Sequence, residues 1–212
     1  HFKLNVLHLH ITDDQGWRFE SKKYPKLTEI GSVLINPNGT KYGPYFYTQS
    51  EMRDVVSYAK LHCITVVPEI DVPGHSQSAI NSYPELNSGV EIPQNNYWRR
   101  YLYCDSLCMC NPRTIEFVKD ILTEVMEIFD SEYVHIGGDE VVPAHFNLCE
   151  KCKAFCKEKG FDDDQTKLQT WFTKTIATFL NENGRKMMGW DEIIDDDLSK
   201  ENAIMAWRSA EI

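Results

Sequence analysis

The chain has 212 residues, of which 42% are hydrophobic and 25% are charged, a composition typical of an ordinary folded protein with a sizeable core. Its 32 acidic residues outnumber its 22 basic residues and give a formal net charge of −10, which disfavours nucleic acids and anionic membranes as partners. No apolar run approaches the roughly 20 residues that a membrane-spanning helix needs, so we expect no membrane span.

The N-terminal stretch, HFKLNVLHLHITDDQGWR, contains a β-rich apolar run at residues 4–11. It lacks the charged, apolar and small-residue regions that make up a signal peptide. A chain that opens inside a strand is expected to be a piece of a longer protein, whose targeting signals, if any, lie upstream.

Four further short apolar runs of strand character follow, at residues 63–70, 133–138, 185–190 and 203–207. Longer segments with a helical period separate them, and this alternation predicts parallel strands joined by crossover helices. Successive units of this kind suit a (β/α)8 TIM barrel, which typically needs ~250 residues. We therefore expect residues 1–212 to form an incomplete barrel of about the second to sixth β/α units, without the first strand and the last strands. A doubly wound open sheet is the alternative, but no Gly-rich dinucleotide loop follows any strand.

Three helical segments carry boundary signals. Thr48 and Glu51 fit a capping box at the start of the first segment. Asn111 and Pro112 fit the cap and first turn of the second segment. The third segment should stop near residues 183–184, where the sequence is Asn-Gly. Each segment carries an apolar stripe, which we interpret as core packing.

Six of the seven cysteines gather in the motifs YCDSLCMC and CEKCKAFC. They are Cys104, Cys108 and Cys110, followed by Cys149, Cys152 and Cys156. A CxxC with a third cysteine is a weak zinc signal unless a matching distant pair is brought close in space. We favour scattered thiols or one or two loop disulfides over zinc, and the redox compartment stays open. The first motif lies within residues 83–110, which have no clear periodicity and are expected to form a long loop over the active face.

The motif HIGGDEVV places Asp139 and Glu140 directly after the third strand. Adjacent residues of a regular strand point to opposite faces, so both can face a ligand only if the backbone bends there. Gly137 and Gly138 permit such a bend and a close approach of the ligand. A solvated acidic turn is the alternative for an isolated pair, but it is disfavoured because chemically useful residues also follow the other four strands.

The first strand ends in HLHITDDQGWR, where His8 and His10 share a face and Asp13 follows them. An HxH at a strand end is typical of metal-dependent amidohydrolases. Those enzymes also need histidines from later strands, whereas the last histidine here is His145. We therefore expect a structural role for His8 and a supporting role for His10.

The second strand ends in PEIDVPGHSQSA, where Glu69, Asp71 and His75 lie close together around a Pro-Gly turn. A carboxylate beside an imidazole raises its pKa and fixes its orientation, and such a relay can tune a catalytic acid. Trp190 and Trp207 end the last two strands, and their flat faces are either core or platforms for sugars and acetyl groups. Their place on successive strand ends of an acidic pocket favours substrate contact.

In chain order, the motifs HLHITDDQGWR, VVPEIDVPGHSQSA, VHIGGDEV, GWDEI and AWR resemble those of the glycoside hydrolase family 20 β-N-acetylhexosaminidases, and the match runs nearly end to end. The resemblance implies a TIM-barrel enzyme that removes a non-reducing terminal β-linked N-acetylhexosamine from an oligosaccharide or glycoconjugate, with retention. It favours a secreted, periplasmic or lysosomal location. We expect no cofactor and no metal, and the oligomeric state and preferred glycan stay open.

The resemblance implies that Glu140 is the general acid/base and that Asp139 orients and stabilises the substrate's 2-acetamido group. Consecutive residues, with Cα atoms ~3.8 Å apart, are poorly placed to hold carboxyl groups on opposite sides of a scissile bond. Family 20 enzymes instead use substrate-assisted catalysis, here through an oxazolinium intermediate. The remaining candidates are Trp190 and Trp207 as walls of the acetamido pocket, Asp13 and His75 as a polar pair beside the acid, and His10 and Asp71 behind them.

Some family features fall elsewhere or differ. We expect several family residues to lie outside residues 1–212. They are an arginine that binds the sugar's 3- and 4-hydroxyls, and a Tyr, an Asp, a Trp and a Glu of the last two strands. Phe146 stands where bacterial relatives often have Trp. Asp191 follows Trp190, and we expect no functional consequence from this residue. The 212-residue piece alone is therefore predicted to be inactive or barely folded. The alternatives are a metal-dependent TIM-barrel hydrolase and a non-catalytic carbohydrate-binding relative.

Overall fold

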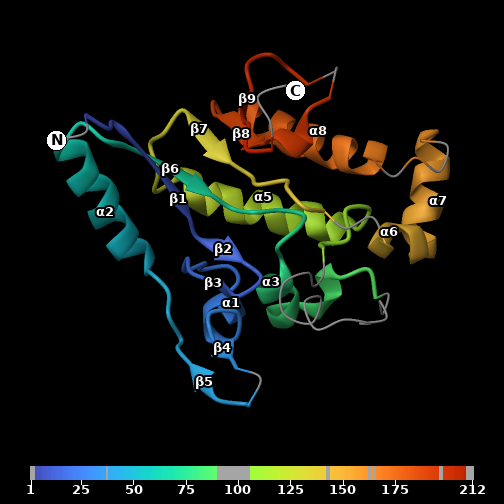
Figure 1. Ribbon diagram of the computed structural model, residues 1–212, viewed down its shortest axis with the longest axis horizontal. Coiled ribbons are helices and arrows are strands. Elements are labelled where there is room, and N and C mark those ends of the chain that lie inside the picture. The colour runs from blue at the N-terminus through green and yellow to red at the C-terminus, as the bar shows by residue number, and fades with distance from the viewer. Residues whose placement is uncertain are drawn as a thin grey trace.

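One parallel sheet of five strands forms the centre of the protein, for which a computed structural model describes residues 3–36, 38–89, 106–141, 144–161, 164, 166–195 and 198–208. In spatial order the strands are β1 (Val6–His10), β6 (Thr65–Glu69), β7 (Tyr133–His135), β8 (Lys186–Trp190) and β9 (Ala203–Met205). All five strands predicted from the sequence are confirmed, each somewhat shorter than its apolar run. Figure 1 shows the strands following one another across the molecule from blue to red.

The strand order distinguishes between the two folds considered. Each strand of this sheet pairs with the next one along the chain, and every pairing is parallel. A doubly wound sheet would reverse its order at a switch point, whereas a barrel adds strands in one direction. The sheet is therefore part of a (β/α)8 barrel, as predicted. Its edge strand β1 leaves Val6 and Leu7 55% and 43% exposed.

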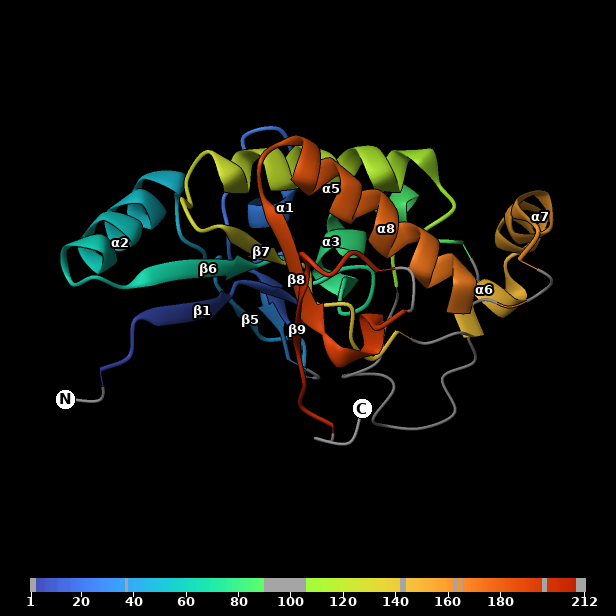
Figure 2. The ribbon, with the colours of Figure 1, turned by 90° about the horizontal axis from the view of Figure 1, so that it is seen from above.

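Three helices cover one side of the sheet, namely α2 (Gln49–Leu61), α5 (Pro112–Met126) and α8 (Thr166–Glu182). Figure 2 shows α5 and α8 together on the same side of the strands. The side chain of Thr48 accepts a hydrogen bond from the Glu51 amide, and the Glu51 carboxylate accepts one from the Thr48 amide, so the predicted capping box is present. Asn111 likewise caps α5 by accepting from the Arg113 amide. Each such cap stabilises its helix by about 1 kcal/mol.

The core lies between these helices and the sheet. The apolar stripes predicted on α5 and α8 contribute to it, although Ile115 and Phe179 of those stripes are only partly buried. The fully buried members include Phe117, Val118, Ile121, Leu122, Phe172, Ile176 and Leu180. Because these helices pack on the outside of the strands, the carboxyl ends of the strands stay free of them.

Several short elements connect the strands and were not predicted. After β1 come β2 (Thr12–Asp13), β3 (Gly16–Trp17), α1 (Lys26–Glu29), β4 (Leu34–Ile35) and β5 (Lys41–Tyr42). Strand β6 is followed by α3 (Gln77–Ser82) and η1 (Pro84–Leu86). Strand β7 is followed by α6 (Ala144–Leu148) and α7 (Glu150–Lys159), and β8 is followed by η2 (Asp191–Ile193). No helix in the described ranges is long and apolar enough to cross a membrane.

The stretch at 83–110, expected to be a long loop, is only partly within the described residues, because residues 90–105 lie outside them. Its two ends are well packed. Leu86, Leu107 and Met109 are essentially fully buried. The Leu107 amide donates to the carbonyl of Pro73, and the Cys108 amide donates to the carbonyl of Leu86. Short-range periodicity could not reveal these ends, because tertiary contacts bury them.

Candidate active site

A pocket of about 480 Å³ opens at the carboxyl ends of the strands. Its walls are His8, His10, Asp13, Glu69, Asp71, His75, Asp139, Glu140, Trp190 and Trp207. All eight site residues proposed from the sequence are therefore brought together. Glu69 and His8 are additional, although the sequence had placed Glu69 at the same strand end. His8, expected to be structural, also lines the pocket.

The acid pair reaches this pocket through a bent backbone. Gly137, Gly138 and Glu140 have positive φ angles of 68°, 90° and 48°, so the chain leaves the extended conformation directly after β7. A Cβ at Gly137 would lie 1.9 Å from Oδ1 of Asp71, which no side chain can tolerate. The predicted bend is confirmed, and it lets Asp139 and Glu140 line the same pocket.

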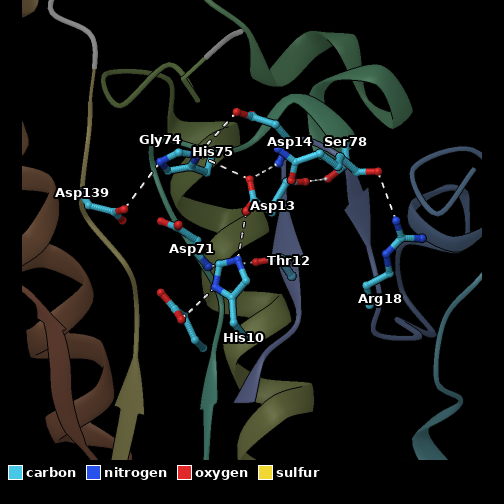
Figure 3. Close-up of polar contacts among 12 residues, drawn as sticks. His10, Thr12, Asp13, Asp14, Arg18, Asp71, Gly74, His75, Ser78 and Asp139 are labelled. Atoms are coloured by element: carbon cyan, nitrogen blue, oxygen red, sulfur yellow. Dashed lines mark hydrogen bonds and ion pairs between the residues drawn. The ribbon is translucent and has the colours of Figure 1, made fainter. Parts of the chain in front are cut away.

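His75 joins the two acids to the end of the first strand, as Figure 3 shows in part. Its Nε2 lies 3.5 Å from Oδ2 of Asp139 and 3.4 Å from Oε2 of Glu140. Its Nδ1 lies 3.4 Å from carboxylate oxygens of both Asp13 and Asp14. Both ring nitrogens therefore face carboxylates, an arrangement that suits a doubly protonated imidazolium.

The charges around His75 shift its titration strongly. Hydrogen bonds with Asp13, Asp139 and Asp14 hold the pKa of His75 well above its usual value, against the effect of burial. Burial opposes ionisation of Asp13, but hydrogen bonds with His10 and His75 outweigh it and keep the pKa of Asp13 below its usual range. At neutral pH the result is a fixed cation between carboxylates that approach it from different strands.

Asp139 also carries an atom without a partner. Its Oδ1 is buried and makes no hydrogen bond with any part of the chain that the structure describes. A buried acceptor of this kind costs free energy unless a donor satisfies it. Behind it, burial and the negative charge of Asp139 raise the pKa of Asp71 well above its usual value, which favours the neutral form of that acid.

Glu69 is the centre of a second polar group deeper in the pocket. Its side chain is fully buried, and Oε2 lies 2.8 Å from both Nε2 of His8 and Nδ1 of His10. Its other oxygen, Oε1, accepts a hydrogen bond from the indole of Trp190 at 2.9 Å. Burial would raise the pKa of Glu69, but contacts with His10, His135 and His8 hold it far below its usual range. Glu69 thus orients one wall of the pocket.

The two tryptophans differ in the contacts that hold their side chains in place. Trp190 packs its ring edge-on against the buried His135 at 4.9 Å between centroids. Trp207 is 53% exposed, and its indole donates to Oε2 of Glu192 while its backbone amide donates to Oδ1 of Asp191. Asp191 is buried, so the expectation that it has no consequence is wrong: it holds the segment that carries Trp207. Its only signal in the sequence is its position beside Trp190.

Sets of three potential metal ligands also occur in and directly beside this pocket. One is formed by His8, Glu69 and His135, whose ligand atoms lie within 4.8 Å of one another. In this set both oxygens of Glu69 already contact ring nitrogens, including the indole of Trp190, which cannot bind a metal. These contacts fit a pocket wall held by ion pairs and hydrogen bonds better than they fit a set of metal ligands.

Comparisons with known proteins place the whole chain in one family. The model of glycosyl hydrolase family 20, catalytic domain, matches residues 1–212. A β-hexosaminidase of Porphyromonas gingivalis is 38% identical over 98% of this chain and 26% of its own length. The human β-hexosaminidase subunit beta is 30% identical over 98% of this chain and 36% of its own length. This chain thus spans about a quarter to a third of these relatives.

Solved structures agree. A chitobiase of Flavobacterium johnsoniae superposes with a TM-score of 0.82 at 38% identity, covering 97% of this chain and 29% of the other. A family 20 exo-β-N-acetylglucosaminidase of Vibrio harveyi, in complex with N-acetylglucosamine, gives a TM-score of 0.86 at 36% identity, covering 99% and 34%. Nothing in these comparisons favours a metal-dependent hydrolase. The chain belongs to glycosyl hydrolase family 20 and contains part of its catalytic domain.

Proposed function

We propose that the complete protein containing this chain is a β-N-acetylhexosaminidase. It releases a non-reducing terminal β-linked N-acetylglucosamine or N-acetylgalactosamine, with retention of configuration. The proposal is supported by the family and by relatives named β-hexosaminidase over nearly the whole of this chain. The single observation that carries it is the adjacent pair Asp139 and Glu140, both facing a pocket walled by two tryptophans.

The pair suits a substrate-assisted reaction. Two adjacent side chains on one strand end approach the substrate from one side, so this pair does not itself supply a nucleophile opposite the acid. Glu140 donates a proton to the glycosidic oxygen while the substrate's own acetamido oxygen attacks the anomeric carbon. The bond to the leaving group breaks and an oxazolinium forms. Glu140, now a carboxylate, accepts a proton from the water that opens this intermediate.

Asp139 handles the acetamido group. Its unpartnered Oδ1 is a ready acceptor for the substrate's amide N–H. Its negative charge balances the positive charge that develops as the oxazolinium forms, a contribution that is strongest where water is excluded. Trp190 and Trp207 supply the apolar walls against which the acetyl methyl group packs.

His75 and Asp13 hold this pair in position. His75 contacts Asp139 and Glu140 with the same nitrogen, so it limits the rotation of both side chains. Asp13 in turn lies within reach of His75 and receives a contact from His10 at 3.1 Å. We assign these residues positioning roles, because none of them needs to touch the scissile bond.

The remaining barrel strands should come from residues outside this chain. Within the described residues the central parallel sheet has five strands, whereas the family's barrel has eight, and the edge strand β1 exposes apolar side chains that a neighbouring strand would cover. On this proposal the 212-residue piece, purified alone, shows little or no activity. Full activity of the piece would contradict it.

The function is tested by hydrolysis of aryl N-acetyl-β-glucosaminides by the complete protein. Glu140→Gln should lower kcat/KM by about 10²–10⁴-fold, the range for loss of a general acid. The loss should be smaller for a substrate whose phenol is more acidic, since such a leaving group needs less protonation. Glu116→Gln, a change at an exposed carboxylate of α5, is the control. Wild-type activity in Glu140→Gln would refute the assignment.

A further inference from the structure

Four cysteines from two distant segments meet in space. Cys108 and Cys110 precede α5, while Cys149 and Cys152 lie in the first turn of α7. The Sγ atoms are separated by 3.5 Å between Cys108 and Cys110, by 3.8 Å between Cys108 and Cys152, and by 3.2 Å between Cys110 and Cys152. Cys149 joins them, with Cys108, Cys149 and Cys152 all within 4.8 Å of one another. We call these four residues the cysteine cluster.

The cluster is built into the fold and does not lie on a surface. Cys108, Cys149 and Cys152 are 1%, 2% and 1% exposed, and Cys110 is partly buried. Cys149 occupies the N-cap of α7, where Ser, Thr, Asp or Asn would usually cap the helix, yet its side chain makes no capping hydrogen bond. Cys149 and Cys152 are three residues apart and so share one side of the helix. The side chains are thus arranged around one another.

The sulfur spacing fits a single metal ion better than disulfides. Two sulfurs that each lie about 2.3 Å from a tetrahedral zinc are separated by about 3.8 Å. Three pairs in the cluster lie at or slightly below that separation, and no pair forms a disulfide. A disulfide would join its sulfurs at about 2.05 Å and would link only two of them. An iron–sulfur cluster would spread the four sulfurs further apart, because irons and sulfides separate them.

The surroundings allow a metal to enter and thiolates to form. A second pocket, of about 490 Å³, is lined by Cys108 and Cys110 on one side and by Lys151 and Glu158 of α7 on the other. It is separate from the pocket that holds Asp139 and Glu140. The first turn of α7 carries the positive end of the helix, which favours negative charge on Cys149 and Cys152.

We propose that Cys108, Cys110, Cys149 and Cys152 bind one zinc ion as four thiolates. Four Zn–S bonds form, the four thiols release their protons to solvent, and no group is oxidised or reduced. The ligand set leaves no open position for water, so the ion has a structural role. The pattern is CxC in one segment and CxxC in the other, which become a four-ligand site only when the fold brings them together.

The zinc would cross-link two segments that both lead to the proposed active site. Leu107, next to the first pair, donates its amide to the carbonyl of Pro73, which starts the turn carrying His75. The second pair begins nine residues after Glu140, at Cys149. Loss of the ion would therefore loosen both supports of the acid pair and lower the stability of the domain.

The test uses the complete protein, purified under reducing conditions without chelator. Elemental analysis is expected to find one zinc per chain, and cobalt substituted for zinc should show thiolate-to-metal charge transfer and the intense visible bands of a tetrahedral site. Cys152→Ser and Cys108→Ser should each lower zinc content at least tenfold and lower the melting temperature. Cys63→Ser, at an exposed cysteine outside the cluster, should retain the metal.

The metal analysis and the cobalt spectrum of the wild-type protein test the zinc site even if a serine variant does not fold. Recovery of folded, metal-free protein with these cysteines in disulfides, shown by mass spectrometry of unreduced peptides, would overturn it. Iron in place of zinc, or a cobalt spectrum without thiolate bands, would do the same. Zinc that is lost in Cys156→Ser but retained in Cys149→Ser would overturn the ligand set, because Cys156 lies one turn further along α7.

Discussion

Two regions of this chain hold residue types that bind metals, and they differ in how those side chains are satisfied. In the pocket at the strand ends, carboxylates and imidazoles face one another at ion-pair distances, as His75 does with Asp13 and Asp139. In the cysteine cluster, the thiols have mainly one another as neighbours. Thiols are weak hydrogen-bonding groups, whereas thiolates are strong ligands. Proximity alone therefore does not identify a metal site, because the available partners decide between an ionic network and a ligand set.

This comparison predicts that the two regions can be damaged independently. Changes in the pocket should alter catalysis and leave the metal content intact. Changes in the cysteine cluster should remove the metal first and affect catalysis through stability. The following substitutions, made in the complete protein, test this separation from the largest expected effect to the smallest.

Of the substitutions considered in this comparison, Asp139→Asn should have the largest effect on catalysis. The substitution keeps the shape of the side chain but removes the charge that balances the oxazolinium. We expect kcat/KM for an aryl N-acetyl-β-glucosaminide to fall about 10²–10³-fold, the range for loss of one preorganised electrostatic group. Zinc per chain, measured on the same sample, should not change. A parallel loss of zinc would show that the two regions are coupled.

His75→Gln should have the next largest effect. It removes the cation that contacts both acids, and contacts to charged groups contribute about 1.5–3 kcal/mol. We expect kcat to fall about 10–100-fold with a changed pH profile and a nearly constant KM, since His75 positions the acids without binding the sugar. The control is His62→Gln, at an exposed histidine after α2. An unaltered pH profile in His75→Gln would contradict the positioning role.

Trp207→Ala should mainly weaken binding. The indole is half exposed and forms one apolar wall of the pocket, so its loss should raise KM about tenfold, corresponding to roughly 1.4 kcal/mol of apolar contact. The kcat should change less, because the acid pair stays in place. Substrate saturation curves and competition by N-acetylglucosamine measure both quantities. An unchanged KM would contradict the assignment of Trp207 to the acetamido pocket.

The smallest effect is a pH dependence of stability that originates at His10. Hydrogen bonds with Asp13 and Glu69 raise the pKa of His10 from 6.5 to about 10 in the folded chain. Because the folded value is the higher one, this stabilisation is complete below the unfolded pKa, about 6.5, and is lost as the pH rises through the folded pKa. The melting temperature of the wild type should exceed that of His10→Gln most at slightly acidic pH. A difference in melting temperature between the two proteins that increases toward alkaline pH would contradict this prediction.

Much of the fold could be predicted because local patterns specify it. The strands, the capping box at Thr48 and the cap at Asn111 depend on neighbouring residues and on hydrophobic periodicity, both of which are visible in the sequence. The short elements, such as α3 and α7, could not be predicted, because few residues define each of them and tertiary contacts decide their conformation. The buried ends of the 83–110 stretch escaped prediction for the same reason.

The site shows the same division. Asp139, Glu140, His75 and the tryptophans follow strands, and parallel strands of a barrel bring their carboxyl ends to one face, so the sequence by itself determined which residues meet. Only the tertiary structure decided the roles of residues whose partners are distant in the chain. Asp191 supports Trp207 from 16 positions away. Cys108 and Cys152 lie 44 positions apart and come within 3.8 Å. Such contacts depend on how helices and loops pack onto the barrel, and no local motif encodes that packing.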